Sequence, residues 1–177
     1  MPTTATAPTA PTTRYRTLVH DSARWSQIQL RAGDIVVSTP PKSGTTWTQM
    51  LCALLVFDGP DFPAPLEQLS PWVDMLDRPV AEVRATLEAQ QHRRIIKTHT
   101  PLDGLPFRDD VHYVVVGRDP RDIAVSFDHH MANLDVGRFL ELRSSVVDPE
   151  DDAVGPPPPV PADAGDRYRC FVTAEDD

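Results

Sequence analysis

The run IVVSTPPKSGTTWTQMLCALLVF (residues 35–57) determines the fold that we predict for this chain. Its first three residues, Ile35–Val37, are apolar and β-branched, which predicts a short buried strand. The prolines at 40 and 41 cannot continue the hydrogen bonds of a strand and therefore end it. Residues 44–57 then predict a helix. A strand, a polar loop and a helix in this order are typical of one unit of a parallel α/β sheet.

The loop between this strand and this helix has the composition of an anion site. Loops at this junction lie at the carboxyl edge of the sheet, and a helix N-terminus offers free N–H groups to a phosphate. Lys42 adds a mobile charge, Gly44 permits close approach of the backbone, and hydroxyl donors come from Ser43, Thr45 and Thr46. A capped helix start is the structural alternative. The lysine precedes the only glycine, so the loop is not a Walker A motif.

Two further apolar runs extend the predicted sheet. Residues 94–99 predict a second strand, and residues 111–117 predict a third that is covered on both faces, because it is almost entirely apolar and β-branched. Residues 80–91 and 119–133 predict helices, the second opened by an Asp-Pro pair. The fold class that we predict is therefore α/β, with a P-loop-like parallel sheet and helices on both faces.

The two ends of the chain differ in composition from its middle. Residues 1–20 begin with Thr, Ala and Pro and predict a disordered N-terminal tail. Residues 21–147 hold the predicted α/β domain. Residues 148–177 predict an acidic, proline-rich tail, within which residues 166–173 form one helical turn or a short strand.

Charge and composition exclude several classes of protein. The 177 residues carry a formal net charge of −9, which argues against a nucleic-acid binder, because such proteins neutralise phosphates with broad basic surfaces. Neither Cys52 nor Cys170 fits a metal or redox spacing, so we expect no metal site and a reducing compartment. The longest apolar run is too short to span a bilayer, and no signal peptide is recognisable. We expect a cytoplasmic protein with no transmembrane segment, and the oligomeric state stays open.

Lys97 and His99 lie in the second predicted strand, within the run KTHTP (residues 97–101). Side chains alternate along a strand, so these two share a face and can point at one ligand. A histidine can take the proton from an attacking hydroxyl. The neighbouring cation disfavours the imidazolium, which predicts a neutral His99 able to act as a base. A histidine that merely ends a strand is the alternative.

Arg118 ends the third predicted strand, and Ser126 lies two helical turns into the helix that follows. An arginine fork and a hydroxyl that converge on one anion form a good phosphate clamp. A surface ion pair of Arg118 with Asp119 or Asp122 is the alternative.

These three motifs resemble those of the PAPS-dependent sulfotransferases of the cytosolic type. Residues 41–47 are similar, without a gap, to their 5′-phosphosulfate loop, residues 97–101 to their Lys-Thr-His-x-Pro segment, and residues 114–127 to their 3′-phosphate region. The resemblance implies 3′-phosphoadenosine-5′-phosphosulfate (PAPS) as donor, no metal, and a hydroxyl or amine of a small molecule or lipid as acceptor. It implies that His99 is the catalytic base and that Lys42 and Lys97 neutralise charge. The cofactor site that it implies consists of Lys42, Ser43, Gly44, Thr45, Thr46, Trp47, Arg118 and Ser126, with Trp47 stacked on the adenine.

The proline-rich residues 58–79 predict a long loop with a turn of helix near Trp72, where the family builds its acceptor pocket. Phe62, Trp72 and Met75 either line that pocket or pack in the core. Residues 146–177 hold no counterpart of the family's late glycine-rich segment, so we expect a truncated or shortened domain with an incomplete C-terminal half. One alternative is a catalytically inactive binding or interaction protein. A P-loop phosphotransferase is another, disfavoured by the absence of an Asp-ended strand for Mg²⁺.

Overall fold

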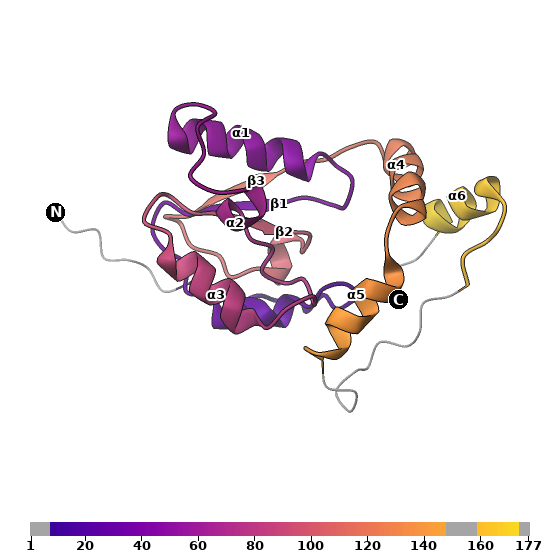
Figure 1. Cartoon of the computed structure of the whole chain (residues 1–177), viewed down its shortest axis with the longest axis horizontal. Coiled ribbons are helices and arrows are strands. Elements are labelled where there is room, and N and C mark those ends of the chain that lie inside the picture. The colour runs from indigo at the N-terminus through magenta and orange to yellow at the C-terminus, as the bar shows by residue number, and fades with distance from the viewer. Residues whose placement is uncertain (1–7, 148–158, 174–177) are drawn as a thin grey trace.

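A computed structural model describes residues 8–147 and 159–173 of the chain (Figure 1). Three parallel strands form one sheet in the order β2-β1-β3: β1 (Ile35–Ser38), β2 (Ile95–Thr98) and β3 (His112–Val115). The register places Val36 opposite both Ile96 and Tyr113. The predicted fold class, a parallel sheet with helices on both faces, is confirmed. Residues 1–7, 148–158 and 174–177, which include half of the predicted acidic tail, lie outside the described residues.

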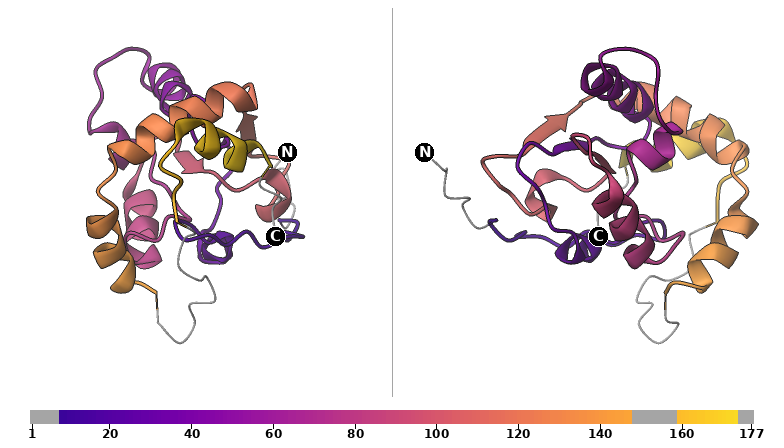
Figure 2. Two further views of the ribbon diagram at one scale, coloured as in Figure 1. Left: turned by 90° about the vertical axis from the view of Figure 1, so that its right-hand side faces the viewer. Right: turned by 60° about the vertical axis from the view of Figure 1, so that its left-hand side comes forward.

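Helices follow the strands in the alternation that the sequence predicts. They are η1 (Ser22–Gln27), α1 (Thr45–Phe57), α2 (Leu66–Leu69), α3 (Val80–Ala89), η2 (Leu102–Gly104), α4 (Pro120–Ala132), α5 (Val136–Ser144) and α6 (Ala164–Thr173). Helix α1 covers one face of the sheet, while η1 and α3 cover the other (Figure 1). Helix α6 is a full helix rather than a single turn or a strand. It packs on α4 (Figure 2), where Arg167 pairs with Asp128.

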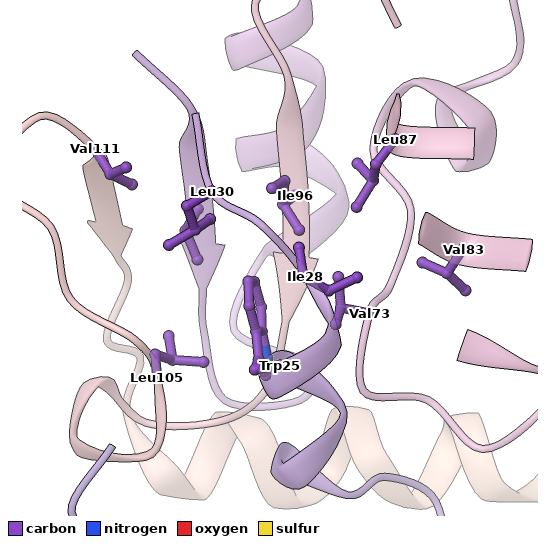
Figure 3. Close-up of a cluster of buried hydrophobic side chains, with 10 residues drawn as sticks. Trp25, Ile28, Leu30, Val73, Val83, Leu87, Ile96, Leu105 and Val111 are labelled. Carbon is purple, nitrogen blue, oxygen red and sulfur yellow. The ribbon is translucent and has the colours of Figure 1, made fainter. Parts of the chain in front are cut away.

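Alternation along β1 and β2 gives each face of the sheet its own apolar core. Ile35 and Val37 face α1 and pack with Cys52 and Ala53. The opposite face holds the larger cluster, which is shown in Figure 3. Its members are Trp25, Ile28, Leu30, Val36, Val73, Val83, Leu87, Ile96, Leu105 and Val111. The first strand is therefore buried on both sides, as its composition predicts.

The prediction that the third strand is covered on both faces is wrong. Strand β3 is half buried at its centre, and Val115 is 58% exposed. The reason is its position at the edge of the sheet: helix α1 packs mainly over β1 and β2, and in the described part of the chain no segment pairs with the outer edge of β3. The outer edge of β2, in contrast, is covered by residues 71–73, where the Lys97 N–H donates to the Pro71 carbonyl.

The loop between α1 and α3 contains the predicted turn of helix near Trp72. This turn is α2, which ends at Leu69, whereas the residues around Trp72 itself are extended along β2. Residues 8–20, which the sequence assigns to the N-terminal tail, make contacts with the domain. Thr9 and Phe107 exchange two backbone hydrogen bonds, and the Tyr15 hydroxyl donates to Asp103.

Candidate functional site

The loop that joins β1 to α1 has the backbone of an anion site. Lys42 and Gly44 both have left-handed backbone, with φ of 63° and 93°. Alternating conformations of this kind turn successive N–H groups toward one point. Gly44 is the N-cap of α1, and no side chain caps the helix. The capped helix start that the sequence left open is therefore not formed, and among the described residues no side chain accepts from the free N–H groups of the first turn.

Ser43 supplies a second observation that points to a ligand in this loop. Its side chain is only 4% exposed, and its hydroxyl has no hydrogen-bond partner among the described residues. A buried hydroxyl without a partner costs about 1–3 kcal/mol. The Thr45 hydroxyl, in contrast, is 2.5 Å from that of Thr39. Thr46 and Trp47 are exposed at the start of the helix, Trp47 by 77%.

Lys97 and His99 both contact the ring of Trp72. The Lys97 ammonium nitrogen lies 4.0 Å from the ring centroid, and the His99 ring packs edge-on against it with centroids 4.6 Å apart. The shared face that strand alternation predicts is therefore present. A cation over an indole face is favourable, by about 0.5–2 kcal/mol depending on its hydration.

His99 is held in one tautomer and in its neutral form. Its Nδ1 lies 2.6 Å from the Thr39 carbonyl oxygen, which can only accept, so Nδ1 carries the proton and Nε2 keeps a free lone pair. Burial lowers the pKa of His99 to about 4, and Lys97 contributes in the same direction. The imidazole is neutral near pH 7, as predicted, although burial matters more than the neighbouring cation. Burial also lowers the pKa of Lys97, against the opposing charges of Asp74 and Asp77.

The third motif reaches the loop through Arg118. Its Nη1 donates to the Lys42 carbonyl oxygen at 2.9 Å, so the guanidinium lies beside the anion loop. Its Nε also lies 3.8 Å from an Asp122 carboxylate oxygen, so the alternative ion pair is present as well. Asp119 caps α4 and pairs with Arg121 rather than with Arg118. Ser126 is half buried on α4, and in residues 8–147 and 159–173 no side-chain hydrogen bond joins it to Arg118.

A cavity of about 500 Å³ opens beside Thr46 and Lys97. Trp72 and Met75 line it, which agrees with one of the two readings that the sequence left open for them. Phe62 does not line it and instead packs on Phe57, with ring centroids 5.9 Å apart. Charged side chains share the lining with apolar ones, among them Glu67, Asp77, Arg78 and Glu82.

Sequence reasoning missed two buried polar residues at this site. The Gln49 amide donates to the carbonyl and the hydroxyl oxygens of Ser70, which fixes the cavity loop to α1. Asp74 accepts hydrogen bonds from Thr98 and Thr100 behind the Lys97–His99 pair. Gln49 interrupts the apolar pattern of α1, a signal that could have been used. Asp74 lies in an irregular loop and has no comparable signal.

The described residues contain neither a metal cluster nor a membrane-spanning helix. Within them, no group of three or more His, Cys, Asp or Glu side chains is placed to hold a metal ion. Their helices include none that combines the length and the apolar character needed to cross a membrane.

Comparison with known proteins gives consistent matches. A family model described as a sulfotransferase domain matches residues 32–154. A glycolipid sulfotransferase of Mycobacterium bovis (strain BCG / Pasteur 1173P2) is 58% identical over 144 residues, which cover 81% of this chain and 44% of that protein. Mouse sulfotransferase 1B1 is 34% identical over 113 residues, which cover 60% and 38%. This chain thus spans less than half the length of the curated relatives it matches.

A solved structure shares the fold. Retinol dehydratase in a complex with retinol and PAP superposes with a TM-score of 0.51 at 24% identity, over 72% of this chain and 51% of that chain. At this identity the likeness supports the fold alone.

Proposed function

This chain belongs to the sulfotransferase domain family, and we propose that it holds the donor site and the catalytic base of a PAPS-dependent sulfuryl transfer. The observation that carries the proposal is the buried, unpartnered hydroxyl of Ser43, located in a loop whose backbone can surround an anion. A phosphate oxygen would supply the missing hydrogen-bond partner. The same loop lies next to a neutral histidine with a free Nε2.

The residues present fit the donor. Lys42 through Thr46 would hold the 5′-phosphosulfate, since the loop offers N–H groups, hydroxyls and one ammonium. Trp47 is exposed at the helix start, where an adenine ring can stack on it. Arg118 already reaches the loop, and with Ser126 it would bind the 3′-phosphate. PAPS, when bound, supplies the sulfuryl group that is transferred.

Residues of this chain would accept the proton of the acceptor and neutralise the negative charge that develops during transfer. His99 Nε2 accepts the proton of the attacking hydroxyl or amine, while the Nδ1–H bond to Thr39 keeps the ring oriented. Lys42 and Lys97 place positive charge where negative charge develops during transfer. The low pKa of His99 means that this base is available without prior deprotonation over the whole range near pH 7.

The cavity beside Lys97 is the proposed acceptor site. Its Asp77, Arg78 and Glu82 side chains offer both donors and acceptors to a substrate with several hydroxyls, and Trp72 and Met75 offer apolar contact. This mixture suits the sugar of a glycolipid better than a purely apolar phenol. The names of the mycobacterial relatives agree with this acceptor class.

Calorimetric titration with adenosine 3′,5′-bisphosphate, alongside ATP, tests the donor site. We expect tight binding of the bisphosphate, weak binding of ATP, and a loss of tenfold or more in Arg118→Ala, because hydrogen bonds to charged groups contribute about 1.5–3 kcal/mol. Arg138→Ala, which removes an exposed arginine of α5 that pairs with Glu141, is the matched control. A folded protein that binds no bisphosphate would exclude the proposed function.

Incubation with PAPS and a panel of glycolipid and phenolic acceptors then separates an enzyme from a binding module. We expect His99→Gln to abolish transfer while bisphosphate affinity stays within about twofold, because the histidine acts on the acceptor proton. Binding without transfer in the unmodified chain would instead support the inactive binding protein.

A further inference from the structure

A buried carboxylate, that of Asp74, lies directly behind the Lys97–His99 pair. The residue has no exposed surface. Its Oδ2 accepts from the Thr98 hydroxyl at 2.5 Å, from the Thr100 hydroxyl, and from the Trp25 indole N–H at 3.4 Å. Three donors from two separate segments therefore converge on one oxygen.

The donors alternate with the proposed catalytic side chains. Thr98 and Thr100 turn toward Asp74, whereas Lys97 and His99 turn toward Trp72. The Thr100 N–H also donates to the Thr98 hydroxyl oxygen, which fixes the end of the strand around the carboxylate. Trp72 and Asp74 are two residues apart in one segment. The segment of residues 72–74 therefore contacts both faces at the end of β2, one through Trp72 and the other through Asp74.

Asp74 differs from the other fully buried carboxylate near the sheet. Asp34 forms an ion pair with Arg94 in which both side chains are 2% exposed. Asp74 has no ion pair within the described residues, and its Oδ1 is buried without a partner. A buried carboxylate without a direct cation is expensive, and a neutral side chain with an accepting oxygen could satisfy the same donors at lower cost. A purely structural role therefore does not require a carboxylate at this position.

We propose that Asp74 is a positioning residue, which holds Thr98 and Thr100 and thereby sets the orientation of Lys97 and His99 toward the reacting groups. The inference rests on the proposed function, because it assigns a role within the same site. The Asp74 carboxylate acts through the threonines and does not touch the substrate. The charged or titratable groups that face it are Lys97 and His99 from the β2 side and His20 and Arg24 from the N-terminal segment.

The test measures the His99 ring by ¹⁵N NMR on the full chain, with no donor and no turnover. In the unmodified protein we expect one neutral tautomer with the proton on Nδ1. The double variant Thr98→Val, Thr100→Val keeps side-chain volume but removes both donors, so we expect the end of β2 to shift and the His99 Nδ1–H bond to the Thr39 carbonyl to weaken. The ¹⁵N shifts should then move toward the average of the two tautomers. Asp74→Asn tests the charge, and the threonine variant keeps the proposal falsifiable if that protein does not fold.

Asp34→Asn is the matched control, because it neutralises the other buried carboxylate. We expect it to lower the denaturation midpoint and to leave the His99 signals unchanged. Wild-type His99 signals in the folded threonine variant would overturn the proposal, as would an equal change in Asp34→Asn.

Kinetics then extend the test for a protein that turns over. We expect the threonine variant to lower kcat at least tenfold with little change in donor KM, since misorientation of a base affects the transition state. A change confined to KM would also overturn the proposal. Absence of bisphosphate binding would remove the proposed function, yet the NMR comparison would still show whether Asp74 orients His99.

Discussion

The two edges of the sheet are built in different ways. At the β2 edge, residues 71–73 cover the strand, and Asp74, Thr98 and Trp25 form a buried network behind it. At the β3 edge, Val115 is largely exposed, and the loop to α4 leads away from the sheet (Figure 1). The proposed base lies on the buried edge and the proposed 3′-phosphate arginine on the exposed one. The base is thus positioned by the packing of this chain, whereas the arginine is held by exposed contacts.

The buried ion pair of Asp34 and Arg94 lies at the start of β1 and β2. Its loss should lower the stability of the fold more than any other change considered below. Asp34 and Arg94 are both buried, and removing one partner leaves an uncompensated charge. We expect Arg94→Met to reduce the free energy of unfolding by about 3–5 kcal/mol, measured by urea denaturation. Arg121→Met breaks an exposed pair on the β3 side and should have little effect. Equal losses in the two variants would contradict the difference between the edges.

Shortening one apolar side chain on each edge tests packing without charge. Ile96 has no exposed surface and lies in the larger core cluster (Figure 3). We expect Ile96→Ala to cost about 2–5 kcal/mol, from lost burial and the cavity left behind. Val115→Ala should stay within about 0.5 kcal/mol, as exposed positions usually do. A large loss in Val115→Ala would show that β3 is covered in solution.

The same contrast explains what the sequence could predict. β1, β2, α1 and α4 follow from local patterns: apolar β-branched runs, proline stops and the Asp-Pro helix start. Coverage of β3 could not be predicted, because composition favours a strand without showing what lies beside it. The three motifs were found because their residues are adjacent in the chain.

Long-range contacts account for the parts of the site that were missed. Asp74 depends on donors more than twenty residues away, and no local pattern encodes such a contact. The extended conformation around Trp72 could not be predicted for the same reason, since it depends on pairing with β2. Propensity is a weak guide wherever tertiary pairing competes with it.

Stability measured as a function of pH would test whether His99, on the covered β2 edge of the sheet, is buried in the folded chain. Its pKa is about 4 in the folded chain, below the value of about 6.5 for an exposed histidine. Between these values the unfolded state binds more protons, so stability should fall as the pH drops from about 6.5 to about 4.

The variant His99→Gln removes this contribution. We expect a smaller loss of stability over the same interval, measured from urea midpoints at several pH values. Burial lowers the pKa of His20 as well, so part of the dependence should persist. Identical pH profiles would mean that His99 is not buried in the folded chain.

The smallest effect concerns the exposed edge and the arginine on it. Arg118 and Asp122 lie 3.8 Å apart, with side chains 41% and 67% exposed. Such pairs contribute about 0.2–1 kcal/mol, so Asp122→Asn should leave stability nearly unchanged. If Arg118 binds the 3′-phosphate as proposed, the Asp122 carboxylate competes with it for the guanidinium, so the variant should bind adenosine 3′,5′-bisphosphate up to about fivefold more tightly.

The control for this variant is Asp109→Asn, which removes one exposed carboxylate elsewhere on the surface. It separates local competition from the general effect of a lower negative charge. High salt should reduce the difference between the two variants, because exposed charges are screened. If both raise the affinity equally, Asp122 does not compete for Arg118, and the arginine is held by the Lys42 carbonyl alone.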